Sequence, residues 1–265
     1  MKVTIVTMDS HLCAAAERAH RVLVQALPGV RLTVHAAAEW GDQPAKLQAC
    51  LDDIASADIV IAAMLFLEDH FQPLLPALKA RREQCDAMVC ILSATEVTKL
   101  TRLGRFDMQA PQSGAMAFLK NLRGKHKDGE AGGSKSTAGE RQMKMLRRLP
   151  KILKYIPGTA QDVRAYFLCL QYWLSGSDTN IGGMVHFLVD RYASGARAHL
   201  KGRARPADPK EYPEVGVYHP RLQHPSAVGR MASTLDALPV AAPGSRGTVG
   251  LLLMRSYLLA GNTAH

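Results

Sequence analysis

The sequence predicts an α/β fold built on a doubly wound parallel sheet. Short apolar runs rich in β-branched residues alternate with segments of helical periodicity over residues 2–92, as expected when a helix joins each pair of parallel strands. The run at 59–64 has no polar alternation, which is typical of a strand buried on both faces. The chain turns polar directly after this run, and the carboxyl ends of strands are where open α/β sheets bind ligands.

Four strands with connecting helices are expected in the first part of the chain. A strand at 2–7 precedes a helix whose apolar residues recur at intervals of three and four, and Asp9 or Ser10 can cap that helix. Right-handed crossovers favour a flavodoxin-like strand order, 2-1-3-4. The other expected elements are strands at 30–36, 59–64 and 87–92, a helix that begins at Pro44, a helix over 68–82 and a short helix at 95–100.

The second part of the chain is predicted to be a helical segment followed by the start of a second α/β domain. Helices are expected at 140–155, after a cap at Thr159, and after a cap at Ser177 or Asp178. A short strand is expected at 215–218 and an apolar strand at 248–254. The apolar strand either completes the first sheet or opens the next domain, and we favour the latter because a buried strand needs neighbours. The predicted division is 1–115 flavodoxin-like domain, 116–139 basic flexible loop, 140–205 helical segment, and 206–265 connector and truncated next domain.

The composition and the apolar runs argue against membrane-spanning, secreted and disulfide-rich proteins. The longest apolar run, 59–67, is nine residues long, well short of the roughly 20 that span a bilayer. The N-terminus lacks the features of a signal peptide, so we expect a cytoplasmic protein with no transmembrane segment. Five scattered cysteines argue against a disulfide framework or a zinc site, and most are expected to be buried thiols.

Six segments carry distinctive sequences: 63–70 (AMLFLEDH), 142–153 (QMKMLRRLPKIL), 156–166 (IPGTAQDVRAY), 171–174, 211–220 and 247–253. In this order they resemble the N-terminal part of the large, porphyrin-binding (H) subunit of magnesium chelatase. The large subunit of cobaltochelatase is a weaker match, since it lacks this version of the N-terminal domain. The resemblance covers essentially the whole chain.

This resemblance implies a role in (bacterio)chlorophyll biosynthesis. Family members bind protoporphyrin IX and receive Mg²⁺ as substrates, while an AAA+ ATPase subunit and a second chelatase subunit are the partners, with ATP on the partner. Members are far longer than 265 residues, so the catalytic residues are expected beyond residue 265 and the chain alone is not expected to be catalytic. The alternatives are a fragment of a cobaltochelatase-type large subunit and a non-catalytic module that docks partners.

Glu68, Asp69 and His70 are candidate metal ligands at the end of the third predicted strand. Their carboxylates suit Mg²⁺, and the group could also remove a proton from a pyrrole nitrogen. The alternative is that acidic residues in the first turn of a helix complement its dipole without any ligand.

Tyr172, Trp173 and His219 are candidate substrate-binding residues. The two aromatic rings could stack on a flat macrocycle, and His219 could be an axial ligand to a metalloporphyrin. Aromatic residues on a helix more often pack in a core, and a histidine before a proline is more often a surface or capping residue.

The positive charge is concentrated at 120–154. This stretch holds eleven Lys or Arg and three Asp or Glu, whereas the whole chain carries a net charge of +10. The stretch could hold porphyrin propionates, acidic partners or nucleic acid, or be a solvated helix face. Nucleic acid ranks last because aromatic residues are not interleaved with the basic ones. The candidate docking residues for an acidic partner are Lys144, Arg147, Arg148 and Lys151.

Nucleotide binding is not expected in this chain. The sequence from Gly129 to Ser136 approaches a phosphate-binding loop, but it lacks the second glycine and no buried strand precedes it. Chance explains this near-match, and ATP is expected on a partner.

Overall fold

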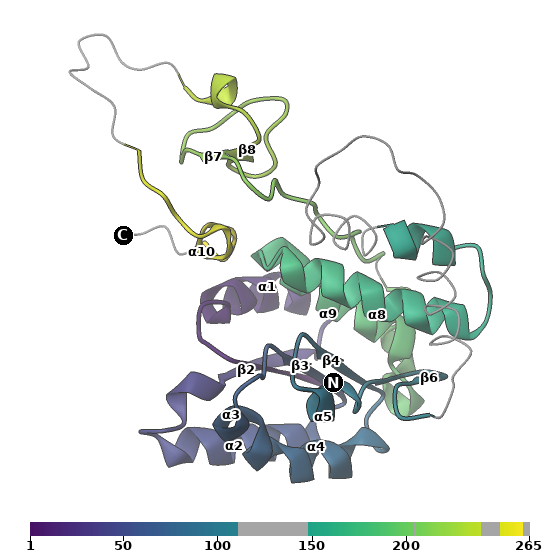
Figure 1. Cartoon of the computed structure of the whole chain (residues 1–265). Coiled ribbons are helices and arrows are strands. Elements are labelled where there is room, and N and C mark those ends of the chain that lie inside the picture. The colour runs from purple at the N-terminus through teal and green to yellow at the C-terminus, as the bar shows by residue number, and fades with distance from the viewer. Residues whose placement is uncertain (111–147, 204, 240–249, 262–265) are drawn as a thin grey trace, which may run out of the picture.

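The computed structural model describes residues 1–110, 148–203, 205–239 and 250–261, and a six-stranded sheet lies at the centre of these residues (Figure 1). The strand order is β2-β1-β3-β4-β5-β6, in which the first four strands are parallel and the last two antiparallel. The α/β class and the predicted order 2-1-3-4 are therefore confirmed. The strands are β1 (Lys2–Thr7), β2 (Arg31–Ala36), β3 (Ile59–Ala63), β4 (Ala87–Ile91), β5 (Arg102–Leu103) and β6 (Phe106–Asp107).

Strand β3 is buried on both faces, as its unbroken apolar sequence predicts. Ile59, Ile61 and Ala63 enter the hydrophobic core on one side of the sheet, and Val60 and Ala62 enter the core on the other side. All five side chains are fully buried. The two-residue repeat of a strand explains this division, because successive side chains point to opposite faces.

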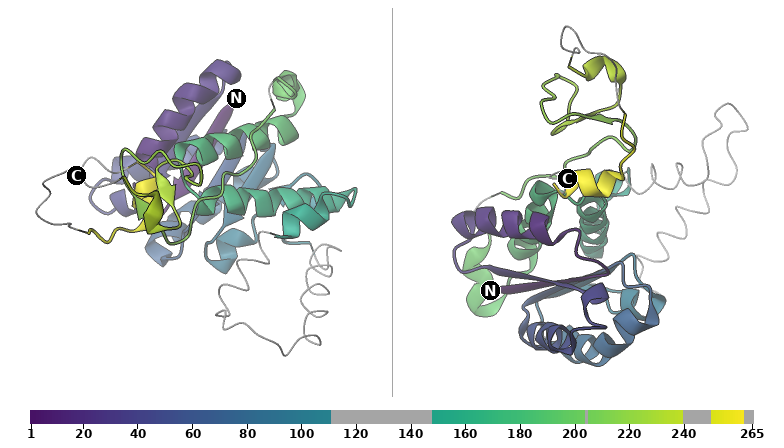
Figure 2. Two further views of the ribbon diagram at one scale, coloured as in Figure 1. Left: turned by 90° about the horizontal axis from the view of Figure 1, so that it is seen from above. Right: turned by 90° about the vertical axis from the view of Figure 1, so that its left-hand side faces the viewer.

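Helices cover both faces of the sheet. The right-hand view of Figure 2 shows the sheet nearly edge-on between the two helical layers. Hydrophobic residues of one layer meet the face that carries Ile59 and Ile61, and those of the other meet the face that carries Val60. The first layer comprises α1 (Cys13–Ala26), α8 (Thr159–Leu174) and α9 (Asp178–Tyr192), and the second α2 (Pro44–Ser56) and α4 (Leu75–Arg82).

The helices at 159–192 share the core of the first sheet. Val163 of α8 and Met184 of α9 belong to the same cluster of buried residues as Ile5 of β1 and Leu23 of α1. The sequence predicted these helices as part of a separate helical segment, whereas in the structure they complete one face of the N-terminal sheet. The four-part division of the chain by residue number stays a prediction.

Local sequence explains several departures from the predicted elements. The helix expected at 68–82 is three short pieces, α3 (Glu68–Phe71), η2 (Gln72–Leu74) and α4, because Pro73 and Pro76 cannot donate backbone hydrogen bonds. Ser177 caps α9 as predicted, by accepting a hydrogen bond from the Asn180 N–H (3.2 Å). The predicted caps of the other two helices are wrong: Leu12 precedes α1 and Gly158 precedes α8, without side-chain caps.

The β5–β6 hairpin was not predicted from the sequence. Its turn begins at Gly104, whose φ of +55° is in the left-handed region that favours glycine. A Cβ at this position would lie 2.7 Å from a carboxylate oxygen of Asp162 in α8. Asp162 accepts hydrogen bonds from the Arg105 N–H and the Tyr192 hydroxyl, each 3.0 Å long, so it links the hairpin to both helices.

The remaining described elements are short. The predicted strand at 215–218 is present as β7, which pairs with β8 in a two-stranded sheet, and the predicted short helix at 95–100 is α5. The strand expected at 248–254 is not formed by its described residues, 250–254, which have no strand partner in the described chain. The short elements of the described chain are η1 (Ala37–Glu39), α5 (Thr95–Thr98), η3 (Gly195–Leu200), β7 (Val217–Tyr218), β8 (Met231–Ala232), η4 (Leu235–Ala237) and α10 (Arg255–Leu259).

The residues before α10 leave a long apolar surface exposed. Leu251 is 81% exposed and Leu252 is fully exposed. This segment adjoins a fixed anchor, because the Arg255 guanidinium donates hydrogen bonds to the carbonyl oxygens of Pro213 (2.7 Å) and Leu174 (3.1 Å). The exposed apolar stretch therefore lies directly before an anchored residue.

The five cysteines are free thiols. Four are buried, and Cys13 at the start of α1 is half-buried. Burial raises the pKa of the Cys85 thiol to about 11 and those of Cys50 and Cys90 to about 12. Among the described residues, no helix has both the length and the apolar character needed to cross a bilayer.

Candidate functional site

The carboxyl ends of β3 and β4 carry unusual backbone. Met64 and Leu92 directly follow these strands and have φ values of +60° and +48°, which residues other than glycine rarely adopt. The two loops are tied together, because the Met64 N–H donates to the Ile91 carbonyl (3.2 Å) and the Leu65 N–H donates to the Ser93 hydroxyl (3.1 Å). Such conformations cost about 1–3 kcal/mol each and gather at functional sites.

Apolar side chains are exposed beside these strained residues. Phe66 is 52% exposed, Leu67 is 54% exposed and Leu92 is 37% exposed. Glu68 and Asp69 follow them and are also exposed. The edge where a ligand was expected therefore presents an apolar surface with an acidic border.

The predicted metal ligands at this edge are not arranged as one site. Glu68, Asp69 and His70 are consecutive residues of α3, so their side chains point about 100° apart around the helix. The His70 Nδ1 atom is buried and has no hydrogen-bond partner among the residues with described positions. Among the residues that the structure describes, no group of three His, Cys, Asp or Glu could hold a metal ion. Their role as metal ligands stays a prediction.

The predicted porphyrin-stacking residues lie in the core. Tyr172 is 2% exposed and Trp173 is 4% exposed, and the Tyr172 hydroxyl donates a hydrogen bond to the Ala207 carbonyl. His219 is half-buried in the turn after β7, where its Nδ1 accepts a hydrogen bond from the Arg221 N–H (3.1 Å). The structure does not gather the three side chains around one surface, and their binding roles stay predictions.

Two of the predicted docking residues are described, and both are exposed. Arg148 and Lys151 lie on the helical segment 148–153, and Lys154 follows it with its side chain also exposed. Lys144 and Arg147 lie outside the described residues. The exposure agrees with a solvated helix face as well as with a docking surface, so the role of these residues stays a prediction.

A hollow of about 230 Å³ lies beside the outer strand β2. Its lining includes Cys13, His35, Trp40 and Lys46. The His35 Nε2 pairs with a carboxylate oxygen of Asp53 in α2 at 2.7 Å. None of the site residues predicted from the sequence lines this hollow.

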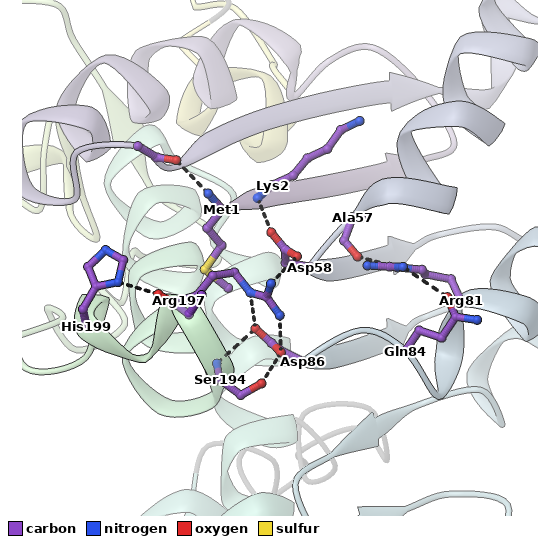
Figure 3. Close-up of polar contacts among 12 residues, drawn as sticks. Met1, Lys2, Ala57, Asp58, Arg81, Gln84, Asp86, Ser194, Arg197 and His199 are labelled. Carbon is purple, nitrogen blue, oxygen red and sulfur yellow. Dashed lines mark hydrogen bonds and ion pairs between the residues drawn. The ribbon is translucent and has the colours of Figure 1, made fainter.

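The amino ends of β3 and β4 hold an ionic cluster that the sequence analysis missed. Asp58 and Asp86 directly precede the two strands, and the Arg197 guanidinium lies between them (Figure 3). Its Nε and Nη2 atoms each lie 2.9 Å from an Asp86 oxygen, and its Nη1 lies 3.2 Å from Asp58. Ser194 also donates to Asp86, through its N–H and its hydroxyl.

This cluster fixes the segment after α9 to the sheet. Burial alone would raise the pKa of Asp86, but hydrogen bonds from Arg197 and Ser194 outweigh it and hold that pKa below its usual value. The signal in the sequence was an aspartate one position before each of two apolar strands. This signal could not identify the arginine partner, Arg197, which lies 111 residues after Asp86.

Comparison with known proteins identifies the family of this chain. The family model described as a domain of unknown function (DUF3479) matches residues 2–167, and the CobN/Magnesium Chelatase model matches residues 170–265. The chain is 47% identical over 99% of its length to the H subunit of magnesium chelatase from Cereibacter sphaeroides. The chain belongs to the family of magnesium chelatase H subunits. It is also 45% identical over 99% of its length to the H subunit of Rhodobacter capsulatus, and 30% identical over 80% to the chloroplastic ChlH subunit of Oryza sativa subsp. indica.

The match is to the N-terminal part of these chelatase subunits. The chain spans about a fifth of the length of the two bacterial relatives, 21% in each case, and 15% of the rice subunit. The junction between the two family models falls at residues 168–169, inside the continuous helix α8. In this chain the two matched regions therefore share one helix and one hydrophobic core.

Proposed function

We propose that the chain is the N-terminal portion of the porphyrin-binding subunit of a magnesium chelatase. That enzyme would insert Mg²⁺ into protoporphyrin IX, both as substrates, in (bacterio)chlorophyll biosynthesis. ATP would be hydrolysed on an AAA+ partner subunit, with a second chelatase subunit as the other partner, in a ligase-type reaction in the cytoplasm. The residues that carry out metal insertion would lie outside this portion.

The match to the H subunit along the whole chain carries this proposal. Identity of 47% extends over 99% of the chain, so the resemblance is not limited to one motif. A scaffolding role is supported by the polar clusters around Asp86 and around Asp162, which connect helices to the sheet.

A chimera tests the proposal directly. Residues 1–265 replace the matching N-terminal region of the Cereibacter sphaeroides H subunit, and Mg²⁺ insertion into a porphyrin is followed by fluorescence with the partner subunits and ATP. We expect activity within about tenfold of the parent, because interfaces between related chains tolerate moderate divergence. A second chimera that lacks the N-terminal region serves as the control. A chimera that folds but shows no insertion, beside an active parent, would contradict the proposal.

A porphyrin titration tests whether this portion itself contributes to the porphyrin site. Deuteroporphyrin is added to residues 1–265 while tryptophan fluorescence and the Soret band are recorded. Saturable micromolar binding would place part of the substrate site in this chain. The alternative, a non-catalytic docking module, predicts no saturable change, and it is favoured by the exposed cations at 148–154.

A further inference from the structure

A short surface next to α8 combines exposed cations with exposed apolar side chains. We call it the basic face. Tyr155 is 82% exposed and Ile152 is 48% exposed, although both are large side chains beside the hydrophobic core. The basic face comprises Arg148, Lys151, Ile152, Lys154 and Tyr155, all of them exposed.

The backbone beneath the basic face is held in place. Leu149 is 3% exposed and Leu153 is fully buried, and both belong to the core that α8 and α9 share. The Gln161 side-chain amide donates to the carbonyl oxygens of Leu153 (2.8 Å) and Lys154 (3.2 Å). The Arg164 Nε also donates to the carbonyl of Pro150 (3.0 Å). The exposed side chains therefore project from a fixed surface, which lowers the entropy lost when a partner binds.

The charge of the basic face is not balanced locally. Residues 141–161 contain six Lys or Arg and no Asp or Glu. No salt bridge joins Arg148, Lys151 or Lys154 to an acid within the described part of the chain. Uncompensated cations create a positive potential that attracts and orients an acidic partner.

We propose that the basic face docks an acidic amphipathic helix of a partner chelatase subunit. Tyr155 and Ile152 would contact the apolar stripe of that helix, and the cations would pair with the acids beside the stripe. Tyrosine and arginine are the side chains that most often dominate such interfaces, and an amphipathic helix presents apolar anchors at intervals of three and four residues. This inference rests on the proposed function, because it assumes that the chain works with chelatase partners.

Paired charge reversals test the proposal. The probes are the two purified partner subunits of the Cereibacter sphaeroides enzyme, measured by biolayer interferometry against residues 1–265 in 50–300 mM NaCl. The variant Lys151→Glu/Lys154→Glu is compared with Lys201→Glu/Arg203→Glu, which makes the same change in net charge at other exposed positions. A third variant, Tyr155→Ser, tests the apolar contact without changing charge.

We expect the reversal in the basic face to weaken binding to one partner subunit at least tenfold and to flatten its salt dependence. Tyr155→Ser should weaken the same interaction at least threefold, and the control pair should change it less than twofold. Circular dichroism melts should be unchanged, because the substituted side chains are exposed.

Three outcomes would overturn the proposal: equal losses in the two charge-reversed variants, no loss in either, or no binding of the unmodified chain at 50 mM NaCl. A loss of binding to single-stranded DNA, with subunit binding unchanged, would assign the basic face to nucleic acid instead. An active chimera in the insertion assay together with any of these results would reject the docking surface and leave the proposed function standing.

Discussion

Removal of the Arg197 side chain should loosen the contact between the segment after α9 and the sheet. In Arg197→Ala, two hydrogen bonds to Asp86 and the ion pair to Asp58 are lost. The side chain of Asp86 is only 4% exposed, so water could reach its carboxylate poorly. The carboxylate would keep the two hydrogen bonds from Ser194 but lose its cationic partner. A buried charge that loses its partner is the costly outcome of such a substitution.

The cost can be set from the geometry. Removing one partner of a buried ion pair costs about 3–5 kcal/mol. The Arg197 side chain is 32% exposed, so water can replace part of its interaction. We therefore expect a loss of about 2–3 kcal/mol in the free energy of unfolding, which corresponds to a fall in Tm of about 5–10 °C for a unit of this size.

Urea unfolding followed by circular dichroism measures this loss. Arg203→Ala is the matched control, because Arg203 is exposed and its Nε donates a hydrogen bond to the His199 carbonyl (3.1 Å), with no ion pair to an acid in the described chain. It should cost less than about 0.5 kcal/mol. Asp86→Asn combined with Arg197→Ala should cost less than the sum of the single changes, since the unpaired charge is gone.

The pH dependence has a definite sign. The pKa of Asp86 is lowered by folding, so its ionised form stabilises the chain above the unfolded pKa of about 3.9. That stabilisation is lost as the pH falls through the lower folded value, and Arg197→Ala should reduce the loss. Two results would refute the assignment of this cluster as the contact that holds the segment. One is a cost below about 0.5 kcal/mol for Arg197→Ala, and the other is an unfolding free energy that falls equally at low pH in the variant and the unmodified chain.

Three further predictions concern the core and the surface. Residues 1–167 alone should bind ANS and unfold without a cooperative transition, whereas residues 1–203 should unfold cooperatively, because α9 covers the sheet only in the longer chain. At pH 8, Ellman's reagent should label only Cys13 before denaturant is added, since Cys13 is half-buried whereas the other four thiols are buried and blocked from the reagent; rapid labelling of Cys90 would contradict this. Leu252→Lys/Leu253→Lys should reduce self-association in analytical ultracentrifugation without changing Tm, because both side chains are exposed.

The sheet was predictable because its signal is local. An unbroken apolar run such as 59–63 identifies a strand buried on both faces, and the spacing of helices between such runs fixes the class and the order of four strands. The β5–β6 hairpin was not predicted because each of its strands is only two residues long. Its conformation depends on Asp162, which lies 57 residues from Arg105 in sequence.

The functional surfaces were predicted less well. Tyr172 and Trp173 fill the core because α8 is covered on several sides, which its aromatic content alone does not reveal. The strained Met64 and Leu92 have no sequence signal, since glycine is the residue that announces a left-handed backbone. The exposure of Arg148 and Lys151 could be foreseen from helical spacing, because Leu149 and Leu153 occupy the buried face.

The uninterrupted helix α8 has a consequence for how the two regions were inherited. Its first half carries the end of one matched family region and its second half the start of the other. A recombination event within α8 would separate Val163 from Trp173 and leave each product with a bare apolar surface. Selection for solubility would then keep the two regions in a single reading frame. We therefore expect that gene fusions, splits and recombination breakpoints among related genes do not fall within the α8 coding sequence.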